Sequence, residues 1–171
     1  KPILISTGMS NESEIGEALE AARQSGAKDI LLFHCVSGYP TPLEESKLSN
    51  IKFLKKHFNV EVGLSDHTLG HSAAIASIAL GAVAIEKHFT LDCRSSGPDH
   101  SASLEPVELK QMVEAIRAID VMLGDGDKIP RGDEIKNREI ARKSLVSSQE
   151  ISEGERFSPE NMTAKRPGTG R

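Results

Sequence analysis

The chain has 171 residues, of which 37% are hydrophobic and 27% are charged. This balance is typical of a globular domain, and the length allows one compact domain with a tail or part of a larger protein. The formal net charge is −4, and no Lys/Arg cluster marks a nucleic-acid surface. No apolar run approaches the roughly 20 residues of a membrane helix, and two cysteines are too few for a disulfide framework. We therefore expect a cytoplasmic protein that binds neither nucleic acid nor membrane.

Short apolar runs alternate with helical patterns over the first 123 residues. The runs are rich in Ile, Leu, Val or Phe, as buried parallel strands are. Strands are predicted at residues 2–6, 29–35, 60–67 and 82–90. Helices are predicted at Glu12–Gln24, at residues 44–58 and 71–80, and at Pro106–Leu123.

Two of these helices carry clear start signals. Ser10 or Asn11 can cap the first one, with Glu14 near capping-box spacing. The last one begins at Glu105-Pro106, and its apolar residues recur at helical spacing. Both segments are therefore predicted to cover a sheet with one apolar face.

A helix after every strand favours a parallel sheet. Successive strands begin about 25 to 30 residues apart, which is the length of one βα unit. Four units fit either a small open sheet or half of an eight-stranded barrel, since a whole barrel typically needs about 250 residues. The chemistry described below favours half of a barrel over residues 1–123.

The sequence changes character after Leu123. Residues 124–143 are rich in turn-forming and charged residues and are predicted to be a linker. Residues 144–148 are predicted to be a strand, and another short element begins at Phe157. The range 144–171 is too short for a core of its own and is expected to begin a small second domain. Lys1-Pro2 and Gly170-Arg171 are abrupt ends, so we expect the chain to be part of a longer protein.

Polar and ionisable residues gather where the predicted strands end. In parallel βα folds, the loops after the strands carry the functional groups. Buried polar groups are costly unless they have partners or a function. Such residues occur at all four strand ends, in residues 6–8, 34–39, 65–68 and 86–90.

Among these residues, His67 and His88 are the strongest candidates for a functional pair. Each ends a strand, and the two strands are consecutive and so expected to be neighbours. Strand alternation places His67 on the face of Ser65 and His88 on the face of Glu86. If both faces point into a barrel, two imidazoles meet at its mouth, where they can bind a divalent metal that also holds substrate. The alternative is that each histidine is simply a hydrogen-bonded residue at a strand end.

Other strand-end residues are weaker candidates. Ser6 and Ser65 can hold a phosphate, although each one alone is better explained as a cap or turn residue. Lys87 suggests a Schiff-base lysine, but alternation points it away from His88. Asp99 lies in a Gly- and Pro-bearing loop after the last strand and is a candidate acid, base or sugar ligand.

In this order, the motifs resemble those of the sialic acid synthases, the N-acetylneuraminate synthases and their legionaminate and pseudaminate relatives. They are KPILISTGM at 1–9, HC at 34–35 with YPTP at 39–42, GLSDHTLG at 63–70, EKHFT at 86–90, GPDH at 97–100 with SLEP at 103–106, and KRPG at 165–168. The resemblance covers essentially the whole chain, and the combination of SDHT with EKHFT is specific. The GPDH form is closer to neuraminate and legionaminate synthases than to pseudaminate synthases.

The resemblance implies an architecture and a reaction. The chain would be the C-terminal half of a (β/α)8 TIM barrel, a linker, and the start of an antifreeze-like (SAF) domain. The full protein would be a domain-swapped homodimer. It would condense phosphoenolpyruvate with N-acetylmannosamine or a related N-acetylated aminosugar and water, releasing phosphate. The family's first four strands would precede Lys1, so the chain alone is expected to be inactive.

The resemblance also implies roles for individual residues. His67 and His88 match the ligands of a divalent metal, Mn²⁺, and together with Asp99 they form the expected catalytic group. Ser6 and Ser65 match positions that bind phosphoenolpyruvate, whereas Tyr39 and Asp99 match positions that contact the sugar. The remaining matches are Ser37, where the family carries Ser or Asn, and Arg166, which would reach the N-acetyl end of the sugar in the partner's barrel.

Two other functions remain open. One is a Schiff-base aldolase that uses Lys87. The other is a carbohydrate-binding or scaffold module in which the histidines are structural. Loss of activity on chelation would favour the synthase over the aldolase. Activity and metal content that survive replacement of His67 by alanine in a full-length version would favour the module.

Overall fold

The structure is a computed structural model that describes residues 1–166. The chain divides into two compact units, Lys1–Asp125 and Gly126–Arg171. The predicted second-domain range 144–171 extends into residues 167–171, and the KRPG motif into Pro167 and Gly168, which lie outside the described residues. Within residues 1–166, no helix is both long enough and apolar enough to cross a membrane.

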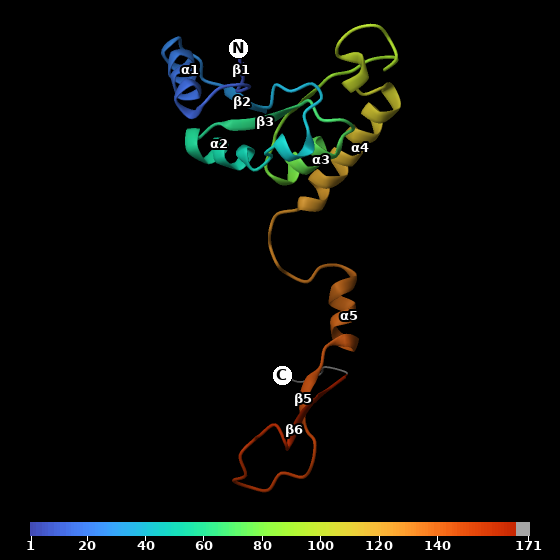
Figure 1. Cartoon of the computed structure of the whole chain (residues 1–171). Helices are drawn as coiled ribbons and strands as arrows, with labels where there is room; N and C mark the ends of the chain where they lie inside the picture. Colours follow the sequence, from blue (N-terminus) through green and yellow to red (C-terminus); the bar gives the residue numbers. More distant parts are fainter. Residues whose placement is uncertain (167–171) are drawn as a thin grey trace. The chain divides into compact units, whose positions relative to one another are not determined.

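The first unit contains a four-stranded parallel sheet in the order β1-β2-β3-β4. Figure 1 shows the chain alternating between strand and helix from β1, in blue, to α4, in gold. Each strand lies beside the next one in the sequence, so the C-terminal ends of all four lie at one edge of the sheet. The strands are β1 (Ile3–Ser6), β2 (Ile30–Cys35), β3 (Glu61–Asp66) and β4 (Ile85–Lys87).

The connecting helices are α1 (Glu12–Gln24), α2 (Asn50–Phe58), α3 (Ser72–Ala79) and α4 (Pro106–Leu123). The predicted bounds of α1 and α4 are confirmed. Asn11 caps α1 and forms a capping box with Glu14. Glu105 forms the equivalent box with Glu108 at the start of α4, with Pro106 in the first turn.

One face of the sheet is covered by the helices. Its buried core contains Leu32 and Val62 from the sheet and Leu19 and Ile51 from the helices, all at most 1% exposed. On the opposite face Leu4 is 59% exposed, and Glu86 is exposed as well. This open face is the one that carries Ser65.

Two predicted elements were too long. The helix expected at residues 44–58 is a 3₁₀ turn, Leu43–Glu45, followed by α2, because Lys47 adopts a φ of 44° that no right-handed helix accepts. The strand expected at residues 82–90 pairs continuously only over Ile85–Lys87, and Phe89 then forms an isolated bridge with Leu104.

The second unit contains α5 (Asp133–Ala141) and an antiparallel pair of strands, β5 (Ser144–Ser147) and β6 (Met162–Lys165). Helix α5 occupies part of the range 124–143, which was predicted to be a linker. All nine of its residues are exposed, so the helix has no buried apolar face that a periodic sequence pattern could have indicated. Asn161 is 2% exposed and holds the β5–β6 connection through hydrogen bonds to Glu155 and Arg156.

His34 lies on the helix-covered face of β2, where it is 4% exposed. Its Nε2–H donates to the carbonyl oxygen of Ser46 at 2.8 Å. Burial lowers the pKa of His34 below the ordinary value of 6.5, against the opposing effect of this hydrogen bond. As the pH falls through 6.5, His34 therefore binds its proton in the unfolded chain before it does so in the folded chain.

We expect the free energy of unfolding to decrease as the pH is lowered from about 7 to about 5, because His34 gains its proton more readily after unfolding. His34→Gln, which keeps a donor for Ser46, should flatten this decrease. Urea unfolding across that pH range measures it. His57→Gln, at an exposed histidine, is the control and should leave more of the decrease in place; equal slopes in both variants would contradict the assignment.

Candidate active site at the C-terminal edge of the sheet

A cavity of about 210 Å³ opens at the C-terminal ends of β3 and β4. It is lined by Ser65, His67, Glu86, Lys87 and His88. The strand register pairs Ser65 with Glu86 and Asp66 with Lys87, so His67 and His88 follow at the same level of the sheet. The predicted meeting of the two imidazoles is confirmed, since their ring centroids lie 5.4 Å apart with a tilt of 64°.

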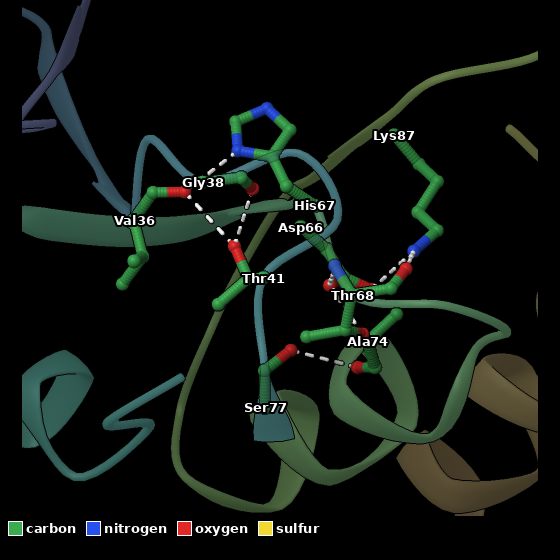
Figure 2. A network of polar contacts seen from close by, with 9 residues as sticks. All are labelled: Val36, Gly38, Thr41, Asp66, His67, Thr68, Ala74, Ser77 and Lys87. Carbon is green, nitrogen blue, oxygen red and sulfur yellow. Dashed lines mark hydrogen bonds and ion pairs between the residues drawn. The ribbon is translucent and has the colours of Figure 1, made fainter. Parts of the chain in front are cut away.

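The orientation of His67 is set by the loop after β2. Its Nδ1 lies 2.9 Å from the carbonyl oxygen of Val36, which can only accept, so Nδ1 carries the proton. Figure 2 shows the other ring nitrogen pointing away from Val36. Nε2 is therefore the nitrogen with a free lone pair, and the carbonyl partner is the usual way in which a protein fixes a metal-binding imidazole.

Thr41 ties this loop to β3. Its hydroxyl donates to the carbonyl oxygens of Gly38, at 2.7 Å, and Val36, at 3.1 Å. Its backbone N–H donates to the carbonyl oxygen of His67 at 2.9 Å. The buried Thr41 therefore holds the acceptor of the imidazole proton, as Figure 2 shows, and its backbone holds the backbone of the histidine itself.

Tyr39 forms the third ring of the cluster. Its centroid is 4.1 Å from that of His67 and 5.6 Å from that of His88. Partial desolvation, and then the neighbouring Cys35, Asp99 and Glu86, raise the pKa of the phenol above its usual value. The hydroxyl therefore stays protonated at neutral pH, able to donate a hydrogen bond.

Two acidic residues complete the surroundings. Asp99 Oδ2 lies 3.8 Å from His88 Nδ1, and both side chains are partly exposed. Glu86 accepts a hydrogen bond of 2.7 Å from the Ser65 hydroxyl. Glu86 was not among the predicted site residues, although its place two residues before His88 on the same face could have identified it.

The other predicted residues are not among those that line this cavity. Ser6 is exposed at the end of β1 and pairs in register with Phe33, so strand β2 separates it from Ser65. The Ser37 hydroxyl lies 3.9 Å from Cys35 Sγ. Cys35, treated in the sequence as an ordinary apolar residue, also lies 3.9 Å from His67 Nδ1. Arg166 belongs to the second unit, where it is exposed directly after β6.

Lys87 is engaged away from the barrel-facing side, as alternation predicted. Its ammonium group forms an ion pair of 2.9 Å with Asp66, and the side chains are 3% and 1% exposed. A lysine nitrogen that is buried against a carboxylate is not presented to the carbonyl group of a substrate. The structure therefore argues against the Schiff-base alternative.

A larger cavity of about 510 Å³ lies between the ends of β1 and β2 and helices α1 and α2. It contains Ser37 and Cys35 but none of the three clustered rings. We assign the chemistry to the smaller cavity, because convergent polar and ionisable groups mark a functional site better than volume does.

The residues present can supply part of a metal site. Among residues 1–166, no group of three or more His, Cys, Asp or Glu side chains is arranged to hold an ion. Two imidazoles with centroids 5.4 Å apart can nevertheless contact one ion at about 2.1 Å from each ring nitrogen. The donor set therefore fits a divalent cation that takes its other ligands from elsewhere.

Fold and site together define a parallel βα half-barrel with a histidine pair at its mouth. The profile of the NeuB family matches residues 1–128. The chain is 51% identical over 172 residues to N,N'-diacetyllegionaminic acid synthase of Campylobacter jejuni, covering 99% of this chain and 52% of that protein. It is 43% identical over 170 residues to pseudaminic acid synthase of the same species, covering 99% and 49%. The chain therefore belongs to the NeuB family.

A solved structure supports the same assignment. The N-acetylneuraminic acid (sialic acid) synthetase of Leptospira borgpetersenii, crystallised with citrate, superposes with a TM-score of 0.72 at 34% identity. The match covers 78% of this chain and 47% of that one. The chain thus spans about half the length of the relatives it matches, and its parallel sheet corresponds to half of their barrel.

Proposed function

We propose that the chain is the C-terminal part of a synthase that condenses phosphoenolpyruvate with an N-acetylated aminosugar and water, releasing phosphate. The observation that carries this proposal is the convergence of His67 and His88 in one cavity of a NeuB family chain. The second unit would begin the SAF domain, and the full protein would be a domain-swapped homodimer.

His67 and His88 would hold a divalent metal, Mn²⁺ being the ion that the family resemblance implies. When bound, such an ion polarises a carbonyl oxygen as a Lewis acid. The hydrogen bond from His67 Nδ1–H to Val36 keeps the Nε2 lone pair available and prevents the ring from rotating.

The neighbouring side chains would bind the sugar. Tyr39, protonated at neutral pH, can donate to a sugar oxygen, and its ring packs on His67. Asp99, half exposed beside His88, can accept from a sugar hydroxyl and exchange a proton with the substrate.

Three serines and an arginine would complete substrate binding. Ser65, already engaged with Glu86, and Ser6 would hold phosphoenolpyruvate. Ser37 would lie at the edge of the sugar site, and Arg166 would reach the N-acetyl group in the partner's barrel.

The relatives and one loop narrow the identity of the aminosugar acceptor. The relatives include a diacetyllegionaminic acid synthase at 51% identity and a pseudaminic acid synthase at 43%. We propose an acceptor of the N-acetylmannosamine type or its diacetylated legionaminate counterpart, since the loop at residues 97–100 resembles those synthases more than the pseudaminate ones.

A chimera tests the function, because the chain alone lacks half of the barrel. The chain replaces the segment that it matches at 51% identity in the C. jejuni diacetyllegionaminic acid synthase, so the chimera keeps that relative's N-terminal half and its other residues outside the segment. We expect the chimera to release phosphate from phosphoenolpyruvate only when an N-acetylated aminosugar is present, and to lose this activity on chelation. Coupled phosphate detection and mass spectrometry of the product measure both.

The 171-residue chain without the added half is the control and should be inactive. A chimera that folds and binds aminosugar but never consumes phosphoenolpyruvate would support a carbohydrate-binding module instead. Activity that is unaffected by chelation would contradict the metal-assisted part of the proposal.

A further inference from the structure

A buried ion pair joins the two residues that directly precede His67 and His88 in the sequence. Lys87 Nζ lies 2.9 Å from Asp66 Oδ2, and their side chains are 3% and 1% exposed. Asp66 is the residue before His67, and Lys87 is the residue before His88. The two charged residues are also direct partners in the β3–β4 register.

The same network holds the backbone on both sides of His67. Asp66 Oδ1 accepts from the backbone N–H of Thr68 at 2.9 Å and from its hydroxyl at 2.8 Å. Lys87 Nζ also donates to the Thr68 carbonyl oxygen. Figure 2 shows the three side chains meeting on the side of the chain away from the imidazole.

Stability alone does not explain two charges at this place. Removing two charges from water costs about as much as their attraction returns, and well-packed apolar residues often serve equally well. A hydrogen-bonded pair does supply a defined separation between the groups that it joins. Because side chains alternate along a strand, fixing Asp66 against Lys87 on one face fixes His67 against His88 on the other.

We propose that the Asp66–Lys87 ion pair is a positioning device that sets the separation of His67 and His88. One part of this inference rests on the proposed function, namely that the separation lets both rings contact one divalent cation. The geometric part stands on the register, the buried pair and the 5.4 Å between ring centroids.

The test compares two variants of the whole chain with the wild type. Asp66→Asn with Lys87→Met removes both charges while keeping an acceptor for the Thr68 N–H, so this double variant is expected to fold. Lys55→Met is the matched control, because Lys55 forms an ion pair of similar length with Glu61, 2.8 Å, but this pair is exposed and remote from His67 and His88.

The first measurement needs no metal. In the metal-free protein, nuclear Overhauser contacts between the ring protons of His67 and His88 report their separation. We expect these contacts in the wild-type chain and in Lys55→Met, and their loss in the double variant. Contacts retained in a folded double variant overturn the inference, as does their absence from the wild-type chain.

The second measurement is Mn²⁺ affinity by titration calorimetry. We expect it to weaken by about 10- to 100-fold in the double variant, as for other residues that orient metal ligands, and to stay unchanged in Lys55→Met. If the wild-type chain binds no Mn²⁺ while the ring contacts still depend on the pair, the proposed metal site fails and the positioning stands. If affinity is unchanged in the folded double variant, the positioning fails.

Folding is followed by far-ultraviolet circular dichroism in every variant. Should the double variant not fold, Thr68→Val replaces it, because this change removes only one hydroxyl donor to Asp66. A partial loss of the ring contacts is then expected. Unchanged contacts in Thr68→Val together with an unfolded double variant would assign the network to folding alone and overturn the inference.

Discussion

Replacing His67 by alanine is expected to abolish divalent-metal binding by the chain and synthase activity by the chimera. Nε2 of His67 is the nitrogen left free by the Val36 hydrogen bond. The ring of His67 lies 5.4 Å from that of His88, and the ring of Tyr39, at 5.6 Å, has no nitrogen to offer a metal. Mutating a residue that only orients a metal ligand weakens metal binding by roughly 10- to 100-fold, so losing the ligand itself should weaken it by more. Titration calorimetry with Mn²⁺ measures the first effect.

The loss of activity should be larger still. A Lewis acid contributes several kcal/mol to a transition state, so its removal should slow the reaction by about 10³-fold or more. Phosphate release by the chimera measures this effect. The control is His57→Ala, which removes an exposed histidine on α2 that pairs with Glu12.

A metal-binding role and a purely structural role of the histidines predict different results for His67→Ala. If the histidines are only structural, His67→Ala should lower stability while the metal content and the activity stay as they are. If His67→Ala and His57→Ala behave alike in every assay, the enzyme assignment of this cavity is wrong.

Gly63→Ala is expected to lower the free energy of unfolding by about 1 to 3 kcal/mol, the usual cost of overpacking. A Cβ at this position would lie 2.7 Å from the carbonyl oxygen of Ala84 and 2.7 Å from the ring of Phe33. The carbonyl is backbone, and it accepts the 2.9 Å hydrogen bond from Leu64 that joins β3 to β4. The added methyl group must therefore push the two strands apart.

Gly16→Ala is the matched control, with the opposite expected sign. Gly16 lies inside α1, and a Cβ there would meet Phe58 at an ordinary 3.7 Å. Alanine should therefore raise the free energy of unfolding by about 0.5 to 1 kcal/mol, because glycine is a poor helix former. Urea unfolding of both variants measures the difference, and equal values would contradict the close approach at Gly63.

Local signals predicted the helices that begin with defined caps. Asn11 and Glu14 mark the start of α1, and Glu105 with Pro106 marks that of α4; both helices have the predicted bounds. These signals succeed because a cap is satisfied by residues three positions away. Helix α5 is preceded by Gly132, which has no side chain to form a cap bond, and none of its residues is buried, so it could not be recognised.

Alternation along consecutive strands also predicted the central pair of the site. His67 and His88 directly follow neighbouring parallel strands, and a side-chain period of two residues places both on one face. Because strand order follows chain order here, this reasoning required no long-range information.

The partners of those residues were decided only by the tertiary structure. Nothing local indicates that Lys87 reaches Asp66, that Ser65 donates to Glu86, or that Tyr39 packs on His67. Each contact joins residues at least 21 positions apart, and it depends on the register of two strands or on the path of a loop. Sequence alone therefore determined which residues face the mouth of the half-barrel, and the packing of strand against strand determined how each of them is held there.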